Sequence, residues 1–172
     1  MPNLLVSDTS VLIDLDRGGL LETLFRLPFG IAVPDVLYVS ELKSWRGKEL
    51  MDLGLQVLEL DAHGVSLAQA YTTADRRISV SDGFALALAT TGGHVLLTGD
   101  QHLRALARRE GVRCHGLLWV LDEFESSGLV SAEDLLAGLA LISSHRRSRL
   151  PAEEVKEREN RYRRRMQGTR QQ

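Results

Sequence analysis

The sequence predicts an α/β fold with a mainly parallel central sheet of about five strands, flanked by helices. Short apolar runs alternate with stretches that carry apolar residues at helical spacing, an order typical of right-handed βαβ crossovers. The chain has 172 residues and is 44% hydrophobic, which is enough to bury the core of one domain. A second full domain is not expected.

Five apolar runs have the length of strands and lie between turn-forming residues. We expect strands at residues 4–7, 30–33, 55–60, 94–98 and 112–115. Pro34 ends the second run, Gly92 and Gly93 precede the fourth, and Gly111 precedes the fifth. A glycine in such a place typically ends the preceding helix.

Helical patterns fill the intervals between these strands. We expect helices at residues 10–16, 20–27, 35–45, 65–74, 81–91, 102–110, 117–126 and 132–144. The last of them opens with a capping pattern at Ser131 and carries Leu135, Leu139 and Ile142 at helical spacing, which predicts a face packed on the domain.

Charge is distributed unevenly along the chain. The formal net charge is -2, but residues 145–172 hold 10 basic and 4 acidic side chains, whereas the rest of the chain holds 11 and 19. From Pro151 the acidic residues come first and the arginines later, which matches the helix dipole, and pairs such as Glu154 with Arg158 can form. This segment is either a solvated helix that frays after Gly168 or an arm for an acidic partner. That partner can be nucleic acid, another protein or the domain's own surface.

Several classes of protein are disfavoured by composition. Cys114 is the only cysteine, which excludes an internal disulfide and a metal site built from several cysteines. The first apolar stretch contains Asp8 and has no cationic leader, unlike a signal peptide. No apolar run approaches the roughly 20 residues of a membrane span, so we expect a cytoplasmic protein without membrane association.

Four acidic residues lie where apolar segments end or helices begin: Asp8, Glu41, Asp82 and Asp100. Asp8 and Asp100 follow predicted strands, and open α/β sheets bind ligands at the carboxyl ends of their strands. Each acid also has a local explanation. The three aspartates, like Ser10 nearby, can cap helices, and Glu41 can be an ordinary helix-surface residue.

Convergence of these acids on one crevice would require a cation. Two carboxylates about 4 Å apart repel by roughly 1 kcal/mol in water and about 4 kcal/mol at an effective dielectric constant near 20. Ligation by oxygen alone suits Mg²⁺ or Mn²⁺, and no Cys or His spacing indicates zinc. The sequence therefore favours a metal-dependent hydrolase.

Four motifs carry a resemblance to a known family: Ser7 to Asp14, Val33-Pro34-Asp35 leading to Glu41, Asp82 to Ala89, and Thr98-Gly99-Asp100. Over residues 3–119 the chain resembles the PIN-domain family, and the helices after that stretch resemble those of VapC-type toxin nucleases. Together with the helical and charge patterns of the later residues, the resemblance predicts a PIN-like nuclease domain over residues 1–128, a helical extension packed on it over 129–150, and a charged, Arg-rich helix or tail over 151–172.

The same resemblance implies a Mg²⁺- or Mn²⁺-dependent endoribonuclease that hydrolyses RNA, often a toxin neutralised by an antitoxin protein, and a homodimer. Asp8, Glu41, Asp82 and Asp100 would be the catalytic and metal-binding residues, with Ser10 and Thr98 in support. Many relatives carry a further acid just after the last aspartate, where this chain has Gln101 and His102. His102 is then either a substitute ligand or proton carrier, or an exposed residue at a helix start.

Other interpretations remain open at this stage. Arg76 and Arg77 precede the Asp82 helix and either contact an RNA backbone or lie in a solvated loop. The missing acid also favours a catalytically weak module that binds proteins through its helical, basic C-terminus. An aspartyl-phosphate phosphatase with Asp8 as nucleophile is a third hypothesis, but that chemistry usually needs a second acid where Ser10 stands.

Overall fold

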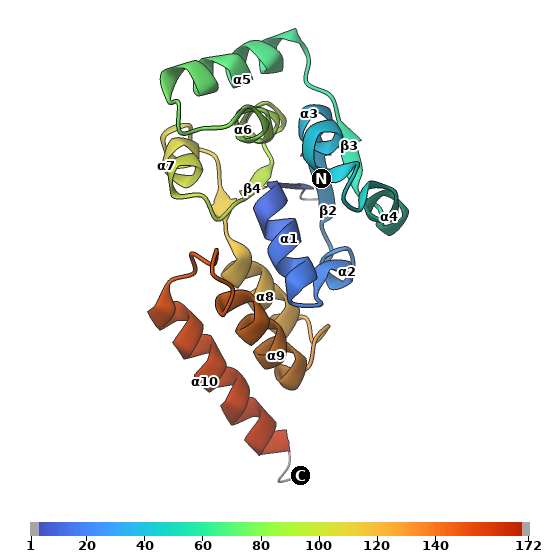
Figure 1. Cartoon of the computed structure of the whole chain (residues 1–172), viewed down its shortest axis with the longest axis vertical. Coiled ribbons are helices and arrows are strands. Elements are labelled where there is room, and N and C mark those ends of the chain that lie inside the picture. The colour runs from blue at the N-terminus through green and yellow to red at the C-terminus, as the bar shows by residue number, and fades with distance from the viewer. Residues whose placement is uncertain (1–3, 170–172) are drawn as a thin grey trace.

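A parallel sheet with helices on both faces forms the centre of the computed structural model, which describes residues 4–169 (Figure 1). The strands are β1 (Leu4–Ser7), β2 (Gly30–Pro34), β3 (Gln56–Leu58), β4 (Val95–Leu97) and β5 (Cys114–His115). Their order is β3-β2-β1-β4-β5, and every neighbouring pair is parallel. The predicted α/β class and the five strands are confirmed.

Helices connect the strands in the predicted alternation. They are α1 (Thr9–Arg17), α2 (Leu21–Leu24), α3 (Asp35–Leu37), the π-helical η1 (Tyr38–Leu42), α4 (Gly47–Leu53), α5 (Ala62–Ala74), α6 (Val80–Gly92), α7 (Gln101–Arg109), α8 (Leu117–Ser126), α9 (Ala132–Ser143) and α10 (Ala152–Thr169). Two features differ from the prediction. Helix α4 was not expected, and the single helix expected over 35–45 is a turn of α-helix followed by η1.

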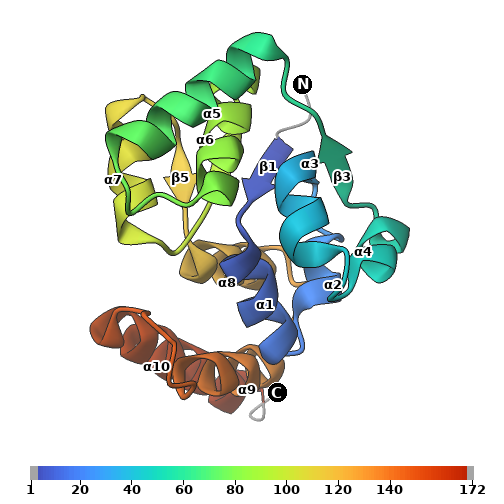
Figure 2. The same ribbon diagram turned by 45° about the horizontal axis from the view of Figure 1, so that its top comes forward.

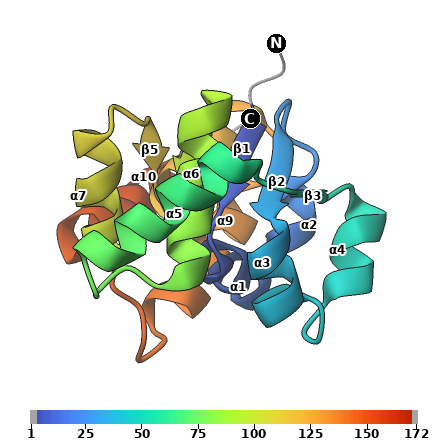
Figure 3. The ribbon, with the colours of Figure 1, turned by 90° about the horizontal axis from the view of Figure 1, so that it is seen from above.

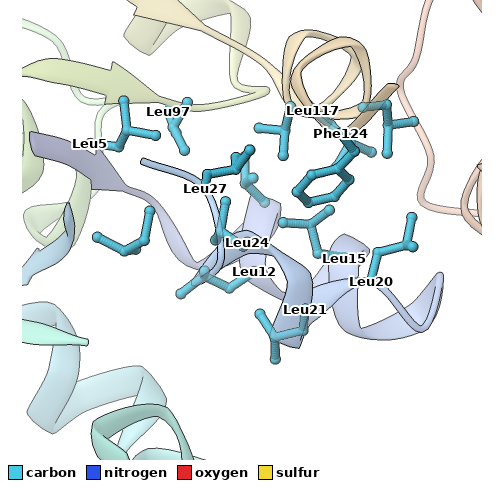
Figure 4. Close-up of a cluster of buried hydrophobic side chains, with 14 of the residues drawn as sticks. Leu5, Leu12, Leu15, Leu20, Leu21, Leu24, Leu27, Leu97, Leu117 and Phe124 are labelled. Atoms are coloured by element: carbon cyan, nitrogen blue, oxygen red, sulfur yellow. The ribbon is translucent and has the colours of Figure 1, made fainter. Parts of the chain in front are cut away.

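The two faces of the sheet contribute to separate cores. Leu5 and Leu97 belong to a cluster with residues of α1, α2, α8 and α9, part of which Figure 4 shows around Leu12, Leu15 and Phe124. Their sequence neighbours on the same strands, Val6 and Leu96, belong to a cluster with α5, α6 and α7. Alternation of buried residues on both faces is what a fully covered parallel sheet requires. Figure 3 shows α4 beyond β3 at one edge and α7 beside β5 at the other.

The helices after the sheet pack against the α1 face (Figure 2). Helix α9 approaches α1 where two glycines meet, since a Cβ atom on Gly138 would lie 3.0 Å from the carbonyl oxygen of Gly18. Leu135, Leu139 and Ile142 are buried, as their spacing predicted. Helix α10 runs beside α9, as Figures 1 and 2 show.

Ion pairs join α10 to α8. Arg158 lies 2.5 Å from a carboxylate oxygen of Asp122, Arg161 lies 2.7 Å from both Asp122 and Glu125, and Arg165 lies 2.8 Å from Glu125. The expectation of a solvated helix was therefore wrong for this face. Of the acidic partners considered, these arginines bind the domain's own surface. Helix α10 continues to Thr169, and residues 170–172 of the predicted tail lie outside the described part of the chain.

Within residues 4–169, none of the helices combines the length and the apolar character required to cross a membrane.

The core beneath α10 contains a hydroxyl group that the protein leaves without a hydrogen bond. Tyr162 is fully buried, its OH has no partner among the described residues, and burial raises its pKa to about 12. We expect Tyr162→Phe to raise the free energy of unfolding by about 1 kcal/mol, because it removes a buried unsatisfied polar group and keeps the ring. Urea unfolding measures the change, and a clear decrease in stability would contradict the predicted environment.

Glu125 is the acid that pairs with two arginines of α10. Burial raises its pKa, but hydrogen bonds from Arg165 and Arg161 outweigh burial, and the pKa lies below its usual value. We expect Glu125→Gln to lower the free energy of unfolding by about 1–2 kcal/mol at neutral pH, since charged hydrogen bonds are lost.

The matched control for this substitution is Glu123→Gln on the same helix, which should leave the free energy of unfolding nearly unchanged.

The contribution of Glu125 to stability should depend on pH. Because the folded-state pKa of Glu125 is depressed, its charged form stabilises the fold above the unfolded-state pKa, and this stabilisation is lost as the pH falls through the folded-state pKa. Wild type and Glu125→Gln should therefore converge in stability in acid. Equal effects of both substitutions, or a difference that persists in acid, would count against this role for Glu125.

Candidate active site

Asp8 follows the last residue of β1 and begins α1. Its backbone N–H donates to the carbonyl of Leu97 at 2.9 Å, which fixes the end of β1 beside the end of β4. One carboxylate oxygen of Asp8 accepts hydrogen bonds from the Val11 N–H and the Ser10 hydroxyl, both at 2.9 Å. The predicted capping role of Asp8 is thus real, and it leaves the side chain only 4% exposed.

Thr98 links Asp8 to Asp100. It is fully buried after β4, and its hydroxyl donates a short hydrogen bond to the second carboxylate oxygen of Asp8. The same hydroxyl accepts a hydrogen bond from the N–H of Asp100 at 3.0 Å. Asp100 in turn caps α7 by accepting from the Leu103 N–H at 2.9 Å. A single side chain therefore positions both strand-end acids.

Asp82 lies in the first turn of α6, which is capped by Ser79 as the sequence predicted. The next residue, Gly83, permits close contact between helices, because a Cβ atom there would lie 2.7 Å from the side chain of Thr72 and 3.0 Å from the carbonyl of Ala68. This contact with α5 fixes the start of α6. Asp82 itself is partly buried.

Glu41 lies on η1 and is exposed. In this π-helical segment the Lys43 N–H donates to the carbonyl of Tyr38 at 2.8 Å, which closes a turn one residue wider than that of an α-helix. The segment contacts the start of α6, since the hydroxyls of Ser40 and Ser81 lie 3.4 Å apart. The wide turn therefore places Glu41 on the Asp82 side of the site.

Burial, and after it the charges of neighbouring acids, raise the pKa values of Asp8 and Asp82. Burial raises the pKa of Asp8 to about 6 against the hydrogen bonds from Thr98, Val11 and Ser10, and the charge of Asp82 adds to the rise. Burial also raises the pKa of Asp82, and the charges of Asp100 and Glu41 raise it further. Asp82 is therefore the electrostatic centre of the acidic cluster, which we define as Asp8, Glu41, Asp82 and Asp100.

The donor chemistry of the acidic cluster fits a hard divalent cation. Among residues 4–169, no three Asp, Glu, His or Cys side chains already form a metal cage. Mg²⁺ does not need such a cage, because it usually keeps several waters and takes one or two carboxylates directly. A cation would also relieve the repulsion that raises the pKa of Asp82. The arrangement suits an open, water-bridged site, and ligation by all four acids stays a prediction.

The other predicted residues lie near the same edge. Arg77 forms two hydrogen bonds of 2.9 Å with Asp75 in its own turn, and Arg76 beside it is exposed. His102 is exposed in the first turn of α7 and contributes to lowering the pKa of Asp75, after the larger effect of Arg77. This placement favours the simpler interpretation of His102, an exposed residue at a helix start.

An open cavity of about 370 Å³ adjoins the acidic cluster. Ser10 and Asp100 line it together with arginines, among them Arg104 and Arg149. These arginines were not among the predicted site residues. One available signal was the spacing of Asp100 and Arg104, which lie four residues apart and hence on one face of α7.

The raised pKa of Asp8 predicts a pH effect on stability. The folded protein holds a proton on Asp8 that the unfolded chain releases between about pH 4 and pH 6, so this group lowers stability as the pH rises through that window. In chelator, we expect Asp8→Asn to gain up to about 3 kcal/mol relative to wild type between pH 4 and pH 7. Urea unfolding across this range gives the difference.

Asp61→Asn is the matched control, because Asp61 caps α5 in the same way but lies outside the acidic cluster. The free energy of unfolding of the Asp61→Asn protein should depend on pH as that of the wild type does. A wild-type profile retained in Asp8→Asn would mean that Asp8 is not the group responsible.

Comparison with known proteins agrees with the resemblance seen in the motifs. A family model described as PIN domain matches residues 4–160, a range that contains the whole acidic cluster and extends into α10. Among curated proteins, none matches the chain. Because the family model covers most of the sequence, the chain belongs to the PIN-domain family, whose members are generally nucleases.

Proposed function

We propose that this PIN-domain protein is a Mg²⁺- or Mn²⁺-dependent endoribonuclease that hydrolyses RNA phosphodiester bonds. The observation that carries the proposal is the geometry at the carboxyl edge of the sheet, where Thr98 joins Asp8 to Asp100 and the charges of Asp100 and Glu41 act on Asp82. Carboxylates whose pKa values are raised by burial and by neighbouring charges, as those of Asp8 and Asp82 are, are a frequent mark of a functional site. Membership of a family whose members are generally nucleases supports the interpretation of these acids as a site for phosphodiester hydrolysis.

The roles of the residues follow from their exposure and their hydrogen bonds. A bound divalent cation would lower the pKa of a water molecule and offset negative charge on the phosphate. Asp8 and Asp100 are the proposed direct ligands, held in place by Thr98, and Ser10 steadies the Asp8 carboxylate. Asp82, in the first turn of α6, and Glu41, which is exposed on η1, would accept hydrogen bonds from water and orient it toward the phosphorus atom.

Single-stranded or looped RNA is the proposed substrate. Its flexible backbone can adapt to the acidic cluster at the edge of the sheet, and its phosphates are attracted to a metal ion and to arginines. Arg76 remains a candidate for such a contact because it is exposed beside α6. Arg77 would have to give up its hydrogen bonds with Asp75 to contribute.

The biological role that we propose is that of a toxin paired with an antitoxin protein, with the homodimer as the assembly. This part of the proposal is supported by the resemblance of the motifs to VapC-type toxins. The alternative, a module that binds proteins through its basic C-terminus, has less support, because Arg158, Arg161 and Arg165 are engaged by α8.

Cleavage of labelled RNA tests the proposed chemistry. We expect cleavage with Mg²⁺ or Mn²⁺, none with chelator, and a fall of at least about a hundredfold in kcat for Asp8→Asn and Asp100→Asn, because each substitution removes a negative ligand. Asp61→Asn should keep wild-type activity, since it changes a helix cap of the same kind elsewhere. Induced expression should arrest growth with wild type but not with Asp8→Asn.

Two results would exclude the proposed mechanism. One is cleavage that persists in chelator, and the other is full activity in a folded Asp8→Asn protein.

A further inference from the structure

The cavity beside the acidic cluster has the size and position of a substrate subsite. Its volume of about 370 Å³ falls in the range of about 300–1,000 Å³ that is usual for small-molecule sites. It lies between the first turns of α1 and α7, helix α8, and the segment that leads into α10. Ser10 and Asp100 belong both to its wall and to the surroundings of Asp8 and Thr98.

The charges around this cavity leave a cationic surface. Of the acids in its wall, Asp14 pairs with Arg17, and both Asp122 and Glu154 pair with Arg158. Three further arginines line the cavity and form no ion pair within residues 4–169: Arg104, Arg147 and Arg149. Asp100 is the acid that remains, and it belongs to the acidic cluster. An anionic ligand that reaches toward a metal at Asp100 would match this distribution of charge.

Aromatic rings lie beside the arginines. His115 and Trp119 both line the cavity, and their rings stack with centroids 4.2 Å apart and an interplanar angle of 9°. Burial, and then the charges of Arg104 and Arg113, lower the pKa of His115, which favours the neutral form of its ring. Arg104 lies against the turn before α8, since a Cβ atom on Gly116 would be 2.9 Å from its Nη1 atom.

We propose that this cavity binds one nucleotide of the RNA strand, next to the phosphodiester bond that is cleaved. Arg104 and Arg149 would hold its phosphate, and the base would pack against the His115–Trp119 pair, as bases do on aromatic side chains in single-strand binding proteins. The position relative to the cleaved bond rests on the proposed nuclease function. Binding of the nucleotide itself requires neither metal nor cleavage.

The fluorescence of Trp119 provides a direct test. In a Trp45→Phe background Trp119 is the only tryptophan, and adenosine 5′-monophosphate is titrated in chelator. We expect a saturable change in Trp119 fluorescence, and apparent affinities about tenfold weaker for Arg104→Gln and for Arg149→Gln, because each removes a charged hydrogen bond. Arg109→Gln is the matched control, as an exposed arginine of α7 that does not line the cavity. Adenosine without the phosphate should bind more weakly.

Anisotropy of a labelled tetrauridylate RNA in chelator gives a second readout, and steady-state cleavage gives a third. Arg104→Gln should weaken RNA binding and raise KM by more than it lowers kcat. The proposal would be overturned if neither chelator assay showed saturable binding. It would also be overturned if Arg109→Gln weakened nucleotide binding as much as Arg104→Gln does. Nucleotide binding that depends on Arg104, in a protein without metal-dependent cleavage, would support the cavity as a nucleotide site and contradict the proposed nuclease function.

Discussion

The hydroxyl group of Thr98 joins the ends of the two central strands, and the geometry of the site depends on it. It donates to Asp8 after β1 and accepts from the N–H of Asp100 after β4. Parallel pairing of β1 with β4 brings these ends together, and the hydrogen bond then holds a nearly buried carboxylate in one orientation. The fold tolerates this carboxylate because hydrogen bonds compensate part of the desolvation that raises its pKa. The remaining repulsion among the acids makes the site attractive to a cation.

Most of the sheet could be predicted from the sequence, because its strands are short apolar runs bounded by proline and glycine. Helix α4 escaped prediction since Gly47 begins it, and a glycine at that place usually indicates a turn rather than a helix. The docking of α10 on the domain was one of several alternatives that the sequence left open. Local pattern alone could not show that Arg158 and Arg161 face Asp122, which lies more than 30 residues earlier in the chain, and the buried Tyr162 was a weak signal among so many charges.

The candidate site was predicted in parts. Asp8, Asp82 and Asp100 could be proposed because they lie at strand ends or at a helix start, whereas Glu41 depended on the resemblance to the family. The wide turn of η1 that carries Glu41 has no sequence signature in a single chain, so its geometry was accessible only from the structure. The same holds for the cavity, because its lining comes from distant parts of the chain, with Arg104 on α7 and Arg149 in the segment before α10. Both the wide turn of η1 and the cavity depend on tertiary contacts, which the local sequence pattern does not reveal.

Calorimetric titration with Mn²⁺ in buffers of different ionisation enthalpy tests most directly whether the acids form a cation site. Because the pKa of Asp8 is about 6 without a cation, binding near pH 6 should release protons, and the heat should depend on the buffer. We predict saturable binding with proton release in wild type and in Asp61→Asn, with loss of both in Asp8→Asn. Absence of Mn²⁺ binding at millimolar concentration, or binding that Asp8→Asn leaves unchanged, would contradict the account.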